Sequence, residues 1–96
     1  MLTGKQKRFL RSEANRLQPL IQIGKNGLTE SVIELIEEAL ESKELIKVSI
    51  LQNCGEDKEV IANQLAEREG LSIVQIIGST IILYKESVEK KRIELP

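Results

Sequence analysis

The chain has 96 residues, of which 41% are hydrophobic and 30% are charged, and its formal net charge is −1. This length and composition are typical of one globular domain and exclude a disordered or low-complexity chain. No apolar run approaches the ~20 residues that cross a bilayer, and the basic N-terminus has no apolar signal region. We therefore expect a single domain over residues 1–96, a cytoplasmic location, a monomer and no membrane partner.

Three residue types are absent or rare, and their scarcity limits the chemistry of the chain. Histidine, the commonest general base and metal ligand, is absent, so no Ser-His-Asp or Cys-His site exists. Cys54 is the only cysteine and cannot form an internal disulfide. Phe9 and Tyr84 are the only aromatic residues, too few for base-stacking platforms. We expect no catalytic residue, no metal, no cofactor and no small-molecule substrate.

Charge is strongly segregated along the chain. Residues 1–28 carry a net charge of +5, residues 29–70 carry −7 and residues 71–96 carry +1. The field near a binding surface depends on local charge. The near-neutral total therefore does not exclude a polyanionic partner.

The first element is predicted to be a helix over Leu2–Leu17, with Thr3 as its N-cap. At helical spacing, apolar side chains gather on one half of this helix and basic ones on the other. The basic residues are Lys5, Lys7, Arg8, Arg11 and Arg16. A charge run on a helix is commonly a solvated face, but such faces usually mix signs. The basic-only half indicates a surface for a polyanion.

A short strand over Leu20–Ile23 follows Pro19, and the loop Gly24-Lys25-Asn26-Gly27 connects it to a helix capped by Thr29. Such a loop presents backbone N–H groups, a lysine and a helix N-terminus, which together favour an anion. Two glycines would also be needed simply to turn the chain. The two glycines therefore predict a turn whether or not a ligand binds, and the loop is in addition a candidate phosphate contact.

Known phosphate-binding motifs do not fit this loop. A nucleotide-hydrolysing P-loop needs glycine where Pro19 stands and Ser or Thr where Asn26 stands, and a dinucleotide fingerprint needs a third glycine. The KH module has a G-x-x-G loop between two helices. Here a strand precedes the loop, so a KH fold is the lesser interpretation.

The helix after Thr29 is the most clearly amphipathic segment, with a continuous apolar arc and a glutamate-rich opposite face. We interpret these glutamates as solvent-exposed and solubilising rather than as metal ligands. They are Glu30, Glu34, Glu37, Glu38 and Glu41.

The second half of the chain predicts a strand over Leu45–Leu51, a helix from the cap Asp57 through Glu69, and two strands over Leu71–Ile77 and Thr80–Lys85. Gly78-Ser79 joins the last two as a hairpin turn, and residues 85–96 are expected to be a loosely held tail. The order α-β-α-β-α-β-β predicts an α/β domain with a mixed four-stranded sheet packed against helices.

Several segments together resemble a known family. IGKNGLTESVIELIEEALESKELIKVSI, VQIIGSTIILYK and the EKKRIELP end are similar to the YhbY family of bacterial CRM-domain proteins, named for chloroplast RNA splicing and ribosome maturation. The resemblance extends over nearly the whole chain. It implies a fold like the C-terminal domain of translation initiation factor three and association with structured ribosomal RNA of the large-subunit precursor.

The same resemblance assigns RNA contacts to the Gly24, Lys25, Asn26 and Gly27 loop and to the nearby basic surface. Relatives often carry a basic residue after the glycine of the final hairpin, where this chain has Ser79, and Lys85 is the nearest remaining base. Our hypothesis is a non-catalytic RNA-binding protein that assists ribosome assembly. The alternative is a protein-interaction adaptor that uses the acidic helix or the hydrophobic sheet edge.

Overall fold

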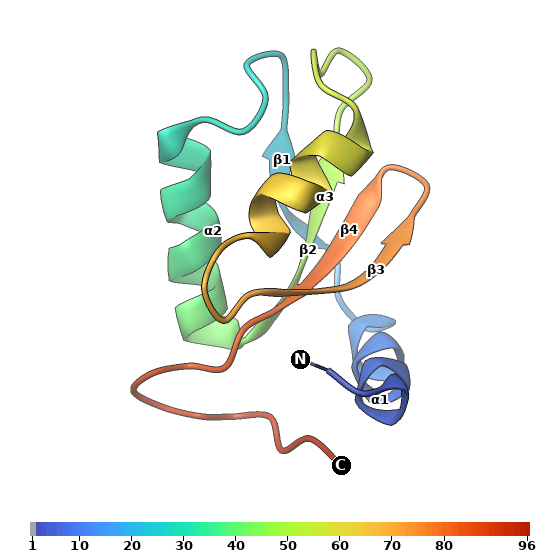
Figure 1. Cartoon of the computed structure of the whole chain (residues 1–96), viewed down its shortest axis with the longest axis vertical. Helices are drawn as coiled ribbons and strands as arrows, with labels where there is room; N and C mark the ends of the chain where they lie inside the picture. Colours follow the sequence, from blue (N-terminus) through green and yellow to red (C-terminus); the bar gives the residue numbers. More distant parts are fainter. Residues whose placement is uncertain (1) are drawn as a thin grey trace.

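The computed structural model of the chain describes residues 2–96. It contains the seven elements in the predicted order (Figure 1). They are α1 (Gly4–Ala14), β1 (Pro19–Ile23), α2 (Glu30–Lys43), β2 (Leu45–Ile50), α3 (Lys58–Ala66), β3 (Ser72–Ile77) and β4 (Thr80–Tyr84).

The four strands form one mixed sheet in the order β1-β2-β4-β3. β1 pairs with β2 in parallel, while β2 with β4 and β3 with β4 are antiparallel. This arrangement confirms the predicted α/β class. The crossover through α2 makes the β1–β2 pair parallel, because a strand that re-enters the sheet beside its predecessor after a helix keeps the same direction.

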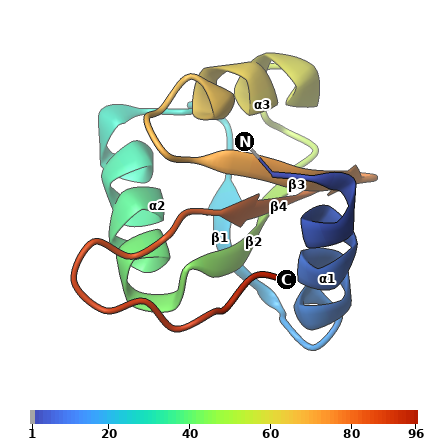
Figure 2. The same ribbon diagram turned by 60° about the horizontal axis from the view of Figure 1, so that its bottom comes forward.

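Side chains of the central strands are apolar on both faces of the sheet, and each face has its own core. Ile46 and Val48 of β2 pack on the side of α2 and α3. Leu45 of β2 and Ile82 of β4 pack on the opposite side, against Leu10 of α1. The molecule is therefore layered, with α2 and α3 over one face and α1 with the C-terminal segment over the other (Figure 2).

Local hydrogen bonds explain where the helices begin and end. Thr3 and Gln6 form a capping box on α1, and Thr29 Oγ1 accepts from the Val32 N–H, so these two predicted caps are confirmed. Asp57 occupies the predicted N-cap position of α3, but its side chain makes no capping hydrogen bond. α1 ends at Ala14 rather than Leu17, because the next amides donate to carbonyls only three residues back and turn the chain toward β1. α3 ends at Ala66 rather than at the predicted Glu69: the Glu67 amide still donates four residues back, but the Arg68 and Leu71 amides donate only three residues back.

The C-terminal segment differs from the loose tail that we expected. Two glutamates hold this segment, one in α2 and one at the C-cap of that helix, and they accept from its main-chain N–H groups and from one hydroxyl. Glu41 accepts from the Ser87 hydroxyl at 2.5 Å and from the Val88 N–H at 2.9 Å. Glu44 accepts from the Ser87 N–H at 2.8 Å and from the N–H of Ile93 at 2.6 Å. We call Glu41 and Glu44 the carboxylate clamp.

Beyond the clamp, the segment continues across the face that carries α1. Ile93 and Leu95 are partly buried against the core that contains Leu10. The carbonyl oxygen of Pro96 accepts from Gln6 Nε2 at 3.2 Å. The segment therefore covers part of the sheet face that α1 leaves open.

The acidic face of α2 also needs correction, because two of its glutamates have structural partners. Glu41 belongs to the clamp, and Glu37 pairs with Arg68 at 3.1 Å and with Lys85 at 2.9 Å. Burial acts to raise the pKa of Glu37, but the bonds from these two cations outweigh it, so the pKa is lowered. Glu30, Glu34 and Glu38 remain exposed as predicted.

Glu44 is the most constrained residue of the clamp. Its side chain is fully buried, and its φ of 66° lies in the left-handed region, where glutamate is uncommon. Burial acts to raise the pKa of the Glu44 carboxyl, but the N–H groups of Ser87, Ile93 and Arg92 and the charge of Arg92 outweigh burial and lower it. The ionised form is therefore the one that the fold stabilises.

We predict that Glu44→Gln lowers the free energy of unfolding at pH 7 by about 2 kcal/mol, because an amide N–H would face a main-chain donor. A carboxyl whose pKa is lowered by folding stabilises above its unfolded pKa, and this stability is lost as pH falls through the folded value. The free energy of unfolding of the parent should therefore decrease as the pH falls below 4.5, the ordinary pKa of a glutamate, and that of Glu44→Gln should decrease less. Urea unfolding at pH 7 and pH 4 measures both.

The matched control is Glu38→Gln, which removes the same charge from an exposed position on α2. It should change stability at pH 7 by less than about 0.5 kcal/mol. Equal stability of Glu44→Gln and Glu38→Gln at pH 7 would contradict a structural role for the clamp.

Candidate nucleic-acid interface

The basic half of α1 faces away from the sheet. Leu10 and Ala14 are fully buried beneath the helix, which fixes the outward direction of the opposite side. Lys5, Arg8 and Arg16 are exposed, and the two other basic residues of the helix are half-buried. Within residues 2–96, Arg16 is the only one of the five in an ion pair, a surface contact of 3.4 Å to Glu13. We call Lys5, Lys7, Arg8 and Arg11 the α1 basic surface.

The Gly24–Gly27 loop is a tight turn at the carboxyl end of β1. The Gly27 N–H donates to the Gly24 carbonyl at 2.9 Å, which leaves Lys25 and Asn26 exposed at the tip. Gly27 has a φ of +68°, a conformation that favours glycine. The sequence therefore predicted the turn correctly, and the exposed tip is accessible to a ligand.

Three features next to the loop weaken its expected attraction for anions. The Val32 N–H at the start of α2 is already bonded to Thr29, and Glu30 in the first turn offsets the helix dipole. Glu56, from the loop between β2 and α3, also lies against Gly27: a Cβ placed on Gly27 would be 2.6 Å from Glu56 Oε1. Gly27 is buried and Gly24 is half-buried, so the attraction of the loop for an anion depends on Lys25 and on close main-chain approach at Gly24 and the exposed tip.

The structure does not bring the α1 basic surface and the Gly24–Gly27 loop into one site. α1 precedes β1 and the loop follows it, so the two lie at opposite ends of that strand (Figure 1). A five-residue strand separates them by roughly 15 Å. They form two contact points rather than one pocket.

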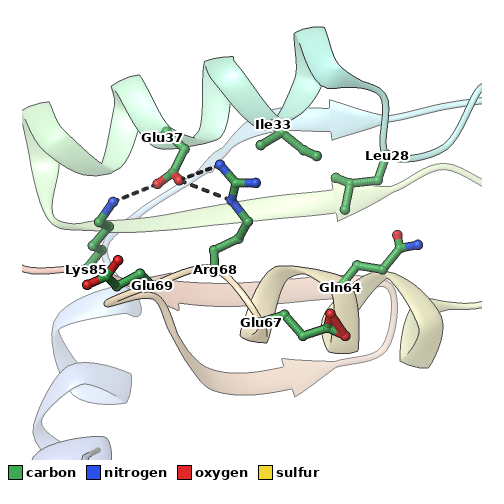
Figure 3. Close-up of a pocket in the computed structure, with 8 residues that line it drawn as sticks. All are labelled: Leu28, Ile33, Glu37, Gln64, Glu67, Arg68, Glu69 and Lys85. Atoms are coloured by element: carbon green, nitrogen blue, oxygen red, sulfur yellow. Dashed lines mark hydrogen bonds and ion pairs between the residues drawn. The ribbon is translucent and has the colours of Figure 1, made fainter.

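Lys85, also predicted as an RNA contact, lies elsewhere. Its side chain is 25% exposed, and it lines a cavity of about 650 Å³ between α2 and the turn after α3 (Figure 3). Lys85 and Arg68 both point at Glu37 from opposite sides (Figure 3). Both cations of this cavity are thus bound to a carboxylate, while Glu67 and Glu69 add negative charge to its wall. The cavity is unsuited to phosphate, and the structure does not group Lys85 with the other predicted contacts.

Lys47 is a basic residue that the sequence analysis did not select. It is half-buried on β2, and its Nζ donates to the Leu17 carbonyl at 3.1 Å, next to a cavity of about 370 Å³ between the end of α1 and the β3–β4 hairpin. Because a carbonyl oxygen has no formal charge, the positive charge of Lys47 is not neutralised by this bond. The alternation of Lys47 with apolar neighbours placed it on one face of the strand, but the sequence did not show that α1 ends beside it.

Residues 2–96 contain no group of three or more His, Cys, Asp or Glu side chains arranged to hold a metal ion. Over the same residues, no helix is both long and apolar enough to cross a bilayer.

Comparison with known proteins gives consistent relatives. The family model described as CRS1 / YhbY (CRM) domain matches residues 2–85. "Probable RNA-binding protein YqeI" of Bacillus subtilis is 59% identical over 96 residues, covering 100% of both chains. A protein named "RNA-binding protein" from Haemophilus influenzae is 43% identical over 95 residues, covering 99% of this chain and 95% of its own. The solution structure of the hypothetical protein SAV1595 from Staphylococcus aureus has a TM-score of 0.81 and 53% identity, covering 100% of both chains.

We predict that Gly27→Ala costs about 1 kcal/mol or more, because alanine is strained at positive φ and its Cβ would overlap Glu56. Adding Glu56→Ala should recover only part of this loss, since the backbone strain remains. Thermal and urea unfolding of the single and double variants measure the two contributions. Full recovery in the double variant would show that the glycine is needed only for space.

Proposed function

The chain belongs to the CRS1/YhbY (CRM) domain family, and on this premise we propose that it is a non-catalytic RNA-binding protein. The names of the two close relatives support the proposal, since both are called RNA-binding proteins. The observation that carries it in this chain is the α1 basic surface. Four basic side chains of one short helix are grouped with no carboxylate partner within residues 2–96.

Backbone recognition is the mechanism that fits these residues. The α1 basic surface neutralises phosphates, and the Gly24–Gly27 loop adds Lys25 and a close main-chain approach at the far end of β1. With Phe9 and Tyr84 packed in or against the core, neither ring offers a stacking platform. RNA shape therefore matters more than base sequence in this proposal.

We propose further that the target is structured ribosomal RNA of the large-subunit precursor and that binding assists assembly of the subunit. Support for this step comes from the family resemblance. The direct experiment is crosslinking of the tagged protein in cells, followed by sequencing of the attached RNA. Reads concentrated on precursor large-subunit RNA are the expected result, and reads spread over unrelated RNAs would overturn the assignment.

The α1 basic surface gives a prediction about salt. With about five phosphates neutralised by these four residues and Lys25, log affinity should fall with log salt at a slope of roughly −3.5 to −4.5. Arg8→Glu with Arg11→Glu should weaken binding and flatten the slope by about 1.5. Binding titrations at several salt concentrations, with thermal melts to verify folding, provide the measurement.

The matched control reverses two exposed lysines away from α1, Lys43→Glu with Lys90→Glu, and so changes net charge equally. It should retain the slope of the parent. Identical slopes for both double variants would remove α1 from the interface.

The loop gives a separate prediction. Lys25→Ala should leave the melting temperature nearly unchanged, because the side chain is exposed and forms no hydrogen bond or ion pair within residues 2–96. RNA affinity should fall about fivefold, or about 1 kcal/mol, for the loss of one charge-assisted phosphate contact. Lys43→Ala, which removes an exposed lysine from α2, is the control and should bind like the parent. A folded Lys25→Ala protein with unchanged affinity would reduce the loop to a turn.

A further inference from the structure

The free edge of the sheet at β1 carries an apolar groove. β1 pairs only with β2 and is therefore an edge strand. Leu20 of β1 and Leu35 of α2 are 50% and 54% exposed, and both line a shallow cavity of about 420 Å³ with Ile21, Gln22 and Ala39. An apolar side chain of a partner could pack against these two half-exposed leucines and bury them.

The backbone of this edge also has free hydrogen-bonding groups. The Ile23 carbonyl accepts from the Leu51 N–H at 2.9 Å, so the polar groups of Ile23 face β2. Because these groups alternate along a strand, those of Gln22 point away from the sheet, whereas the register shift between Pro19 and Ile21 interrupts the alternation at Leu20. An extended segment laid along β1 would find a free donor and a free acceptor at Gln22.

The charge beside the groove specifies the occupant. Glu34 and Glu38 lie within one helical turn of Leu35, outside the groove, where they also line a cavity with Arg68 and Lys85. Both are exposed, and neither forms an ion pair within the described residues 2–96. RNA is repelled by this border. A second copy pairing through β1 would bring two acidic α2 helices side by side, which like charges oppose.

We propose that the β1–α2 groove binds an extended, basic protein segment that adds to the sheet as a fifth strand. Alternate apolar side chains of the segment cover Leu20 and Leu35, and its lysines or arginines meet Glu34 and Glu38. The groove lies on the α2 side of the sheet and the α1 basic surface on the other (Figure 2). One molecule can therefore hold RNA and a basic protein segment together.

The probe is a labelled nine-residue peptide, capped at both ends, in which lysine alternates with valine or leucine. It should bind the parent protein, and amide exchange at Gln22 should slow in the complex as its N–H group gains a partner. Methylating alternate backbone nitrogens of the peptide should weaken binding about tenfold. Equal binding of the methylated peptide, or unchanged exchange at β1, would overturn strand addition.

Protein variants locate the site. Leu35→Gln should weaken peptide binding about fivefold or more, and Val60→Gln, which changes an apolar side chain of α3 that is 43% exposed, should stay within about twofold. Glu34→Gln with Glu38→Gln should weaken binding about threefold, whereas the equal charge change Glu59→Gln with Glu67→Gln should not. Equal effects within either pair would overturn the assignment to this groove.

The proposed RNA function is tested separately from this inference. Leu35→Gln should bind a hairpin RNA like the parent, and the RNA-bound parent should still bind the peptide. Loss of peptide binding on addition of RNA would show that the two ligands share a surface, which contradicts the proposal. Peptide-dependent dimerisation, seen by sedimentation, would assign the groove to a second copy instead.

Discussion

The two central strands are apolar on both faces, and the arrangement of the rest of the chain follows from that constraint. Ile46, Val48 and Leu83 require cover on one side of the sheet, while Leu45 and Ile82 require it on the other. Burial of such side chains is worth about 1.5–3 kcal/mol each, so neither face can be left to water. α2 and α3 cover the first face, and α1 and the C-terminal segment cover the second (Figure 2).

This layering converts a charge pattern along the sequence into a charge pattern in space. The basic N-terminal region supplies the helix of one face, and the acidic middle region supplies both helices of the other. A nearly neutral protein thereby presents an outer surface that attracts phosphate and another that repels it. The two proposed ligands, RNA and a basic protein segment, correspond to these two surfaces.

The carboxylate clamp completes the second face. α1 has only 11 residues and leaves part of the sheet uncovered. Glu41 and Glu44 fix the main chain of the C-terminal segment so that Ile93 and Leu95 reach this gap. An ionised, buried carboxylate is stable there because main-chain N–H groups replace the water it loses. The clamp thus links the end of α2 to the layer that supports α1.

The sequence was informative where periodicity is local and uninformative where partners are distant. The arc of α2, the alternation in β2 and the Gly78-Ser79 hairpin predicted the elements and the mixed sheet. No local pattern in the sequence predicts the clamp, because Glu44 accepts hydrogen bonds from main-chain groups 43 and 49 residues away. The interpretation of all α2 glutamates as solvent-exposed failed for the same reason, since Glu37 meets Arg68 and Lys85 only in the folded chain.

Unlike the clamp, the separation of the two proposed RNA contacts could be predicted from the order of the elements along the chain. One contact precedes β1 and the other follows it, so the length of that strand holds them apart. Strand β1 pairs with β2 along its length, and the spacing is therefore rigid. A flexible single strand could reach either contact alone, but only RNA whose phosphates are fixed at the matching distance gains from both without an ordering cost. The rigid separation thus favours folded RNA over unstructured RNA, with no contact to a base required.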